Sequence, residues 1–386
     1  MNKNIFNEDF AKDFFSNNFG KKYLYKEQAI PNTLEIMSLD ILNQILTIRS
    51  NWNNKNFKMM LDKKPINYFE FSSLFLETSG EVWRPDINKV ENWIAKGCSI
   101  ILNDISCINS GLIKITNELQ RLTNGRCQGN LYFSMESRKA FGPHCDEHDV
   151  FALHVEGEKV WNIYENTEIN PINHPVFKYS EDERVKKAGK LIDQITLKPG
   201  DLLYLPRGQY HDALASKSGS IHIAFGLTYF KPIDLLSLMW EKFIISNCMR
   251  EDFDKNSTKK ELKNHLKKLS IELVKIIDND QTVEILSENI KKWPNDIQDY
   301  NLNNIVKEER KFKVLKSIKI EKKGLEKYIS NGKNAVLIPK EYEDITSYIF
   351  KQEYITYNLI IAKFNKLSEQ KIRDCIKKLN DMKVLE

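Results

Sequence analysis

Hydrophobic and polar positions fall into short alternating runs between residues 98 and 230. The clearest runs are NLYFSM, DVFALHV, KVWNIYE, QITLKPGDLLYLP and SIHIAFGLTYF, separated by glycine, proline and asparagine. Alternation with period two, rich in β-branched and aromatic residues, predicts strands, and the Gly157 position reads as a tight turn between two of them. The spacing of these strands favours a mostly antiparallel barrel or jelly roll.

The pattern on either side of this β-rich region is helical. Residues 1 to 97 mix helical stretches such as SLDILNQILTIRS with short connectors, and from 231 to 300 apolar residues recur with a period near 3.6. We therefore expect an α+β protein with a barrel domain at 1–230, including N-terminal helices, and a helical domain at 231–300. The apolar stripes of these helices need a cover, which makes a homodimer plausible.

Residues 301–386 form a third predicted domain. Ser368 is a good helix N-cap, and one face of the helix that follows carries Ile372, Cys375, Ile376 and Leu379. This ending resembles a winged helix. Its polar face mixes lysine and arginine with acidic residues and is only weakly basic, so we expect packing or docking there, with nucleic acid an unlikely partner.

The composition says more about where the protein is located than about which reaction it catalyses. The net charge of +5 over 386 residues is mild, and hydrophobic residues make up 41% of an ordinary globular composition. The N-terminus has no apolar run of signal-peptide type, and no window approaches a membrane span, so we expect a cytoplasmic protein that does not enter membranes. The six cysteines are scattered without a CxxC pair, which favours reduced thiols.

The candidate chemistry lies in the segment FGPHCDEHDVFALHVEGEKVW. His144 and Asp146 are one residue apart, so on an extended backbone both side chains project to one face and can share a metal ion. His211, after the Pro-Arg-Gly turn in YLPRGQYH, can supply a third ligand. Two histidines and one carboxylate leave coordination positions open, which is the arrangement that non-haem Fe(II) oxygenases use, although some zinc hydrolases share it.

These segments resemble a known family. NLYFS, the HxD segment, GDLLYLPRGQYHDA and SIHIAFGLTYF look like those of the JmjC-type ribosomal oxygenases, which are cupin-related protein hydroxylases. The resemblance implies a double-stranded β-helix (jelly-roll, cupin-like) barrel, Fe(II) held by His144, Asp146 and His211, and 2-oxoglutarate as cosubstrate. It also implies that Lys159 and Tyr132 bind 2-oxoglutarate. One departure is Ala224, near a point where many members carry a serine or threonine hydroxyl.

Three functions stay open at this point. The first is hydroxylation of a residue in a protein or peptide, such as a ribosomal protein or a ribosomally made peptide. The second is demethylation of a methylated protein or nucleic acid, and the third is a binding module without catalysis. Among the remaining candidates, we expect His222 to make a core hydrogen bond or, second, a contact in the pocket, and Arg207 to serve the turn before His211.

Overall fold

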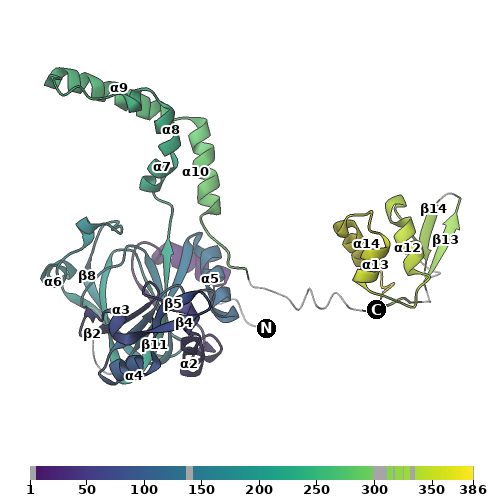
Figure 1. Cartoon of the computed structure of the whole chain (residues 1–386), viewed down its shortest axis with the longest axis horizontal. Helices are drawn as coiled ribbons and strands as arrows, with labels where there is room; N and C mark the ends of the chain where they lie inside the picture. The colour runs from purple at the N-terminus through teal and green to yellow at the C-terminus, as the bar shows by residue number, and fades with distance from the viewer. Residues whose placement is uncertain are drawn as a thin grey trace. The chain divides into compact units, whose positions relative to one another are not determined.

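The computed structural model describes residues 6–135, 142–298, 311–315, 318–324, 326–330 and 335–385. The chain divides into two compact units, residues 1–298 and 299–386. The first unit contains both the β-rich region and the helical segment that follows it (Figure 1). The finer division of this unit at residue 230 stays a prediction.

One antiparallel sheet system dominates the first unit. Its strands follow the order β1-β10-β8-β11-β7-β6-β2-β3, with β9 paired to the second half of β8. The two long central strands, β8 and β11, pair with each other along both halves, with a register shift between Ala215 and Ser220. The strands are β1 (Leu24–Lys26), β2 (Phe57–Leu61), β3 (Lys64–Pro65), β6 (Ser99–Leu102), β7 (Arg126–Ser134), β8 (Asp149–Thr167), β9 (Leu191–Leu197), β10 (Leu202–Leu205) and β11 (Gln209–Thr228).

Gly157 does not end a strand, contrary to the expected turn. β8 runs unbroken from Asp149 to Thr167, and Gly157 adopts φ 71° within it. A Cβ at this position would lie 2.1 Å from the carbonyl oxygen of Gly219 on β11, so only glycine fits. The glycine therefore lets one strand change direction and serve both halves of the barrel.

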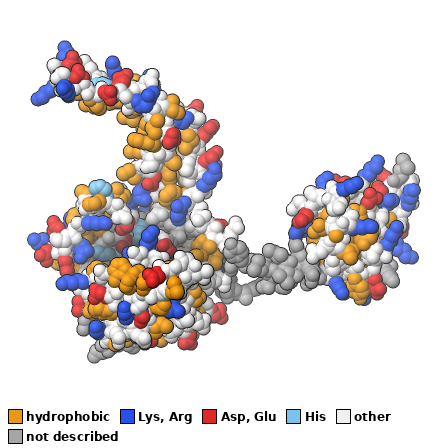
Figure 2. Space-filling view, in the orientation of Figure 1, with side chains coloured by type: hydrophobic (Ala, Val, Ile, Leu, Met, Phe, Trp, Pro, Cys, Tyr) orange, Lys and Arg blue, Asp and Glu red, His pale blue; other side chains and the backbone are white. Residues whose placement is uncertain are grey.

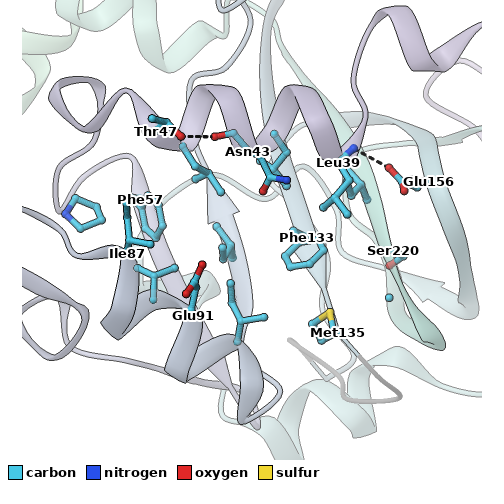
Figure 3. Close-up of a pocket in the computed structure, with 18 of the residues that line it drawn as sticks. Leu39, Asn43, Thr47, Phe57, Ile87, Glu91, Phe133, Met135, Glu156 and Ser220 are labelled. Carbon is cyan, nitrogen blue, oxygen red and sulfur yellow. Dashed lines mark hydrogen bonds between the residues drawn. The ribbon is translucent and has the colours of Figure 1, made fainter.

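The alternation of side chains along these strands separates two faces. On β7, Tyr132 is paired with His222 of β11, while its neighbour Phe133 is the register partner of Ile100 and Ile221. One face carries the polar pocket described below and a small apolar cluster that includes Trp161. The other face carries the main core and packs against N-terminal helices (Figure 3).

Helices and one hairpin complete the first unit around the barrel. Several helices begin at a side-chain cap, such as Ser38 before α2 and Asp86 before α4. β4 and β5 pair only with each other. These elements are α1 (Glu8–Asn17), α2 (Leu39–Thr47), α3 (Tyr68–Phe71), β4 (Ser72–Glu77), β5 (Gly80–Pro85), α4 (Ile87–Ala95), α5 (Ser110–Thr123) and α6 (Glu181–Ala188).

The helical segment after the barrel contains α7 (Pro232–Leu238), α8 (Trp240–Ile245), α9 (Lys259–Ile277) and α10 (Asp280–Lys292). Its end returns to the barrel, because Trp293 Nε1 donates to the carbonyl oxygen of Thr228 at 2.7 Å. Solvent-exposed hydrophobic side chains lie along these helices (Figure 2). Trp240 and Ile245 are 61% and 75% exposed. None of the helices in the described ranges has both the length and the apolar character needed to cross a bilayer.

The second unit is small and mixed. Ser368 caps the last helix as predicted, accepting from the Lys371 amide, and the predicted apolar face of that helix is buried. The winged-helix identity of this unit stays a prediction. Its elements are β12 (Phe312–Lys313), β13 (Lys319–Lys323), β14 (Glu326–Ser330), β15 (Ala335–Leu337), α12 (Glu343–Ile349), β16 (Tyr354–Ile355), α13 (Tyr357–Lys363) and α14 (Glu369–Asp381).

Candidate metal centre

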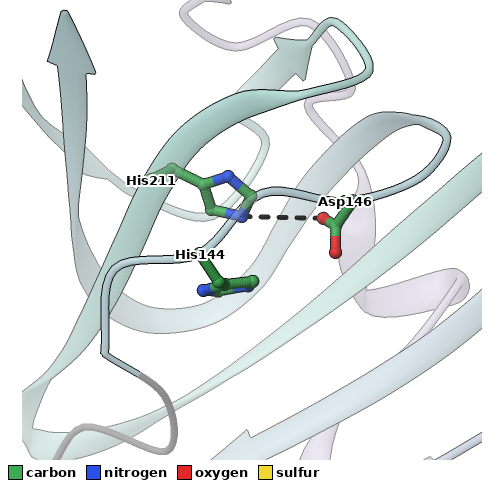
Figure 4. Close-up of side chains that lie close together, drawn as sticks. All are labelled: His144, Asp146 and His211. Atoms are coloured by element: carbon green, nitrogen blue, oxygen red, sulfur yellow. Dashed lines mark ion pairs between the residues drawn. The ribbon is translucent and has the colours of Figure 1, made fainter. Parts of the chain in front are cut away.

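The structure brings His144, Asp146 and His211 together at one end of the barrel (Figure 4). His144 and His211 face each other across an antiparallel bridge, with backbone N–H to O distances of 3.0 and 2.8 Å. The Asp146 carbonyl accepts from the Gly208 amide at 3.0 Å, which fixes the segment against the start of β11. One donor atom from each of the three side chains lies within 4.8 Å of the others.

Backbone contacts fix which ring nitrogens are available. Nδ1 of His144 lies 2.9 Å from the Gly142 carbonyl oxygen, and Nδ1 of His211 lies 2.9 Å from that of Gln209. Because a carbonyl oxygen only accepts, Nδ1 carries the proton in each neutral ring and Nε2 keeps its lone pair. Nε2 of His211 lies 3.6 Å from Oδ2 of Asp146. This tautomer is the one that metal-binding histidines adopt when a backbone group orients the ring.

The protonation states also suit a cation. Burial, and then the nearby His144, lower the pKa of His211 to about 4, so its imidazole is neutral at pH 7. Burial alone raises the pKa of Asp146, but attraction to His211, His144 and His148 outweighs it, and the pKa lies below its usual value. Two imidazole nitrogens and one carboxylate fit a divalent metal, and three protein ligands leave positions for other molecules.

Lys159 lies in the same barrel interior and is 4% exposed. Its Nζ donates to Ser134 Oγ at 3.3 Å and approaches His222 Nδ1 at 3.4 Å. Within the described ranges no carboxylate pairs with this ammonium. Burial therefore lowers the pKa of Lys159 to about 7, and an anion entering the pocket would find a positive charge that lacks a counter-charge.

Aromatic rings connect this lysine to the metal ligands. Tyr132 stacks on His222 with ring centroids 4.8 Å apart, and Trp161 packs against both His211 and His222 at 5.6 and 5.5 Å. Burial, and then the charge of Asp146, raise the pKa of Tyr132, so its hydroxyl stays protonated and able to donate. All five predicted site residues thus share one interior.

Several polar groups in this interior were not predicted from the sequence. Ser134 lies two residues after Tyr132 on the same face of β7, and Ser220 is its register partner on β11. Ser220 is 2% exposed. Its buried Oγ and the buried Nε1 of Trp161 have no hydrogen-bond partner among the described residues. Buried donors without partners are rare in folded proteins and fit a pocket that receives a polar ligand.

Two weaker candidates have structural roles. Arg207 donates from its amide to Asp149 at 2.7 Å and from its guanidinium to the carbonyl oxygens of Pro171 and Asn170, as expected for a turn residue. His222 is buried and its Nδ1 lies 3.4 Å from Lys159 Nζ, which fits the expected core hydrogen bond. Ala224 lies opposite Asn130 and brings no hydroxyl, but Ser134 brings one to the same lysine.

Known proteins resemble part of this chain. The family model described as "JmjC domain" matches residues 103–235, which include all five site residues. The barrel part of the chain, residues 103–235, is thus similar to a JmjC domain. The predicted JmjC/cupin fold class is therefore confirmed for the barrel.

Two curated relatives and two solved structures are also similar to the chain. The Dictyostelium discoideum "Bifunctional lysine-specific demethylase and histidyl-hydroxylase NO66" is 30% identical over 214 residues, covering 55% of this chain and 40% of that protein. Its Drosophila persimilis namesake is 36% identical over 129 residues, covering 33% and 18%. The chain thus spans less than half the length of these curated relatives.

The solved structures match over almost the whole chain. The X-ray structure of Escherichia coli YcfD has a TM-score of 0.53 at 14% identity, covering 97% of each chain. A second structure, titled as YcfD, a ribosomal oxygenase from Escherichia coli, in complex with cobalt and 2-oxoglutarate, gives 0.51 at 14% identity with the same coverage. At an identity this low, the structural match shows a shared fold alone.

Proposed function

We propose that this protein is an Fe(II)- and 2-oxoglutarate-dependent oxygenase that hydroxylates a residue in a protein or peptide. The observation that carries the proposal is the pairing of two features in one barrel interior. One is the three-donor group of His144, Asp146 and His211, and the other is the buried ammonium of Lys159. A metal alone explains the first feature and leaves the second unexplained.

The three-donor group favours Fe(II). Two histidines and one carboxylate on one side of an ion are the facial triad of non-haem iron oxygenases, and they leave coordination positions open for a chelating cosubstrate and O₂. When bound, Fe(II) and 2-oxoglutarate supply the oxidation that places one oxygen atom of O₂ on a carbon and leaves succinate and CO₂. The chain's own residues bind, orient and shield the reactants.

Lys159 suits the distal carboxylate of 2-oxoglutarate. A carboxylate beside a buried ammonium gains a charge-assisted contact, and Ser134 already lies within 3.3 Å of Nζ to add a hydroxyl. The protonated hydroxyl of Tyr132 can donate to the same anion or to a ligand nearer Asp146. We therefore assign Lys159 and Tyr132 to 2-oxoglutarate and add Ser134, which offsets the missing hydroxyl at Ala224.

The substrate assignment rests on the relatives. A solved neighbour is titled a ribosomal oxygenase, and the curated relatives are named as histidyl-hydroxylase and lysine-specific demethylase. Both names point to a polypeptide, so we propose a protein or peptide substrate, including a ribosomal protein or a ribosomally made peptide. A methylated cation needs aromatic faces around it. The rings of Tyr132 and Trp161 are already packed against His222 and His211, so we prefer hydroxylation.

Demethylation of a methylated protein or nucleic acid is the alternative, and one experiment separates the two. The protein is loaded with Fe(II) without oxygen and then given 2-oxoglutarate, O₂ and candidate peptides, and succinate is measured. We expect succinate from wild type and from the control His265→Ala, which changes a histidine of α9 outside the barrel, and none from His144→Ala. Mass spectrometry of the peptide then distinguishes a gain of one oxygen atom from loss of a methyl group. Turnover that persists in His144→Ala contradicts the metal assignment, and a wild-type protein that binds no Fe(II) and releases no succinate would favour a binding module.

We also propose that the chain forms a homodimer through α7–α10. These helices expose large apolar side chains to an extent that is unusual for a monomer's surface. No residue of α9 is buried. A second copy would cover matching faces by two-fold symmetry. The winged-helix identity of the second unit and a cytoplasmic location stay predictions.

A further inference from the structure

An apolar slot lies on the outer face of the barrel, away from the metal ligands. It occupies the space between α2 and α4, above β6, β7 and β11, and has a volume of about 680 Å³ (Figure 3). Its floor is one row of register partners, Ile100, Phe133 and Ile221. Because side chains alternate along β7, Phe133 faces this slot while Tyr132 and Ser134 face the pocket on the other side of the sheet.

The walls of the slot are apolar and already part of the core. Leu42 of α2 and Val90 of α4 are almost fully buried, while Leu46 and Ile94 on the same helices are only partly buried and border the unfilled space. Protein interiors are close-packed, so an apolar space of this size on a folded domain marks a place where another molecule binds.

The dimensions of the slot suit a helix. α2 and α4 each contain nine residues, which gives each wall a length of about 13 Å at 1.5 Å per residue. The side chains of an amphipathic helix at positions i, i+3 or i+4, and i+7 extend over about 10 Å and are the usual anchors in such a groove. A helix with three apolar anchors therefore matches both the length and the chemistry of the slot.

The charges at the mouth of the slot decide which helix fits. Arg49 is held over the Phe75 ring at 4.4 Å, and the carboxylate of Glu156 accepts from the Leu39 amide at 2.8 Å. Glu91 of α4 is exposed, and Figure 3 shows its carboxylate pointing across the slot toward α2. Among the described residues Glu91 has no hydrogen bond or ion pair, so it is the acidic group available to a ligand.

We propose that this slot is a docking site for an amphipathic helix of a partner protein, with apolar anchors on one face and a lysine or arginine that pairs with Glu91. None of His144, Asp146 and His211 lines the slot, so we expect docking there to be independent of the metal. Docking there would hold a partner at the barrel while the interior pocket stays open.

The proposal is tested with model peptides and the full-length protein. The probe is a fluorescent helical peptide of about 15 residues, with leucines at i, i+3, i+4 and i+7 and lysines on the flanks. A second peptide has glutamate in place of lysine, and a third has the first composition scrambled so that the leucines share no face. Fluorescence anisotropy measures binding to wild type, Glu91→Lys and Ile87→Asp, with Glu284→Lys and Val185→Asp as controls at exposed helix positions outside the slot.

We expect wild type to bind the lysine peptide and to reject the scrambled one. Glu91→Lys should weaken the lysine peptide and strengthen the glutamate peptide, each by about fivefold, because one exposed pair changes sign. Ile87→Asp, at a lining residue that is 57% exposed, should weaken both peptides, and the control variants and His144→Ala should bind like wild type. Equal binding of the scrambled peptide, or no preference change in Glu91→Lys, overturns the proposal. Displacement of the peptide by a fatty acid that itself binds independently of Glu91 would also overturn it, in favour of a lipid site.

Discussion

Replacement of Lys159 by methionine should raise stability and remove cosubstrate binding at the same time. Burial lowers the pKa of Lys159 from 10.5 to about 7, so at pH 7 folding costs on the order of 4 kcal/mol for this group. Methionine has a similar length and no charge, and it forfeits contacts to Ser134 and His222 worth about 1 kcal/mol each. The unliganded variant should therefore be more stable than wild type by roughly 2 kcal/mol.

The pH dependence of this gain has a definite sign. Since the pKa of Lys159 is lower in the folded state, the unfolded chain holds more protons between about pH 7 and pH 10.5. The contribution of Lys159 to stability thus becomes less unfavourable as pH rises through this window. The advantage of Lys159→Met should be full near pH 7 and should shrink steadily toward pH 10.

Cosubstrate binding should change in the opposite direction. Removal of one partner from a buried charge pair costs about 2–5 kcal/mol, so Lys159→Met should bind 2-oxoglutarate at least about 30-fold more weakly. Urea unfolding with and without Mn(II) and 2-oxoglutarate measures both effects, and Lys190→Met, at an exposed position, serves as the control. A destabilised variant that still gains the wild-type stabilisation from 2-oxoglutarate would refute the role given to Lys159.

Further predictions concern the pocket, the metal and the helices. Ser134→Ala should weaken 2-oxoglutarate by about fivefold in Mn(II)-loaded protein, by calorimetry, and unchanged affinity contradicts its contact with the anion. At pH 8, 2-oxoglutarate binding should take up close to one proton, because the anion restores the charge of Lys159; heats that do not differ between phosphate and Tris buffers contradict this. Asp146→Ala should lose Co(II) binding in equilibrium dialysis, and retained stoichiometric binding would place the metal elsewhere. Ile245→Asp should convert a dimer to a monomer in sedimentation, and an unaltered sedimentation coefficient argues against an α7–α10 interface.

The strands of the barrel were predictable because the alternation of apolar and polar residues is a local pattern in the sequence. Alternating apolar runs mark strands directly, and β7, β10 and β11 lie where those runs predict them. The expected turn at Gly157 was wrong for a physical reason. Glycine accompanies both turns and close backbone approaches, and only the contact with Gly219 of another strand shows which applies.

The candidate site was also predictable only in part. His144 and Asp146 share a face through simple i, i+2 spacing, and His211 follows a Pro-Arg-Gly turn, so the sequence itself indicated all three metal ligands. The family resemblance supplied the roles of Lys159 and Tyr132. Ser134 also lies at i+2 from Tyr132, so alternation could have indicated it. Ser220 could not be found in this way, because its place depends on which residues of β7 and β11 are in register.

The outer slot lies beyond the reach of sequence patterns. Its floor comes from three strands and its walls from two helices, and each residue there looks like ordinary core. Whether such residues fill their space depends on how α2 and α4 are spaced above the sheet, which is a property of the assembled fold.

The central claim is that one barrel interior holds Fe(II) and 2-oxoglutarate together. Anaerobic titration of the protein with Fe(II) and then 2-oxoglutarate tests it directly, because chelation of Fe(II) by a 2-oxo acid gives a visible charge-transfer absorption band. We predict that wild type and the α9 control His265→Ala develop the band at one equivalent of each, that Lys159→Met needs far more 2-oxoglutarate, and that His211→Ala develops none. Absence of the band in wild type, or its persistence in His211→Ala, would contradict the claim.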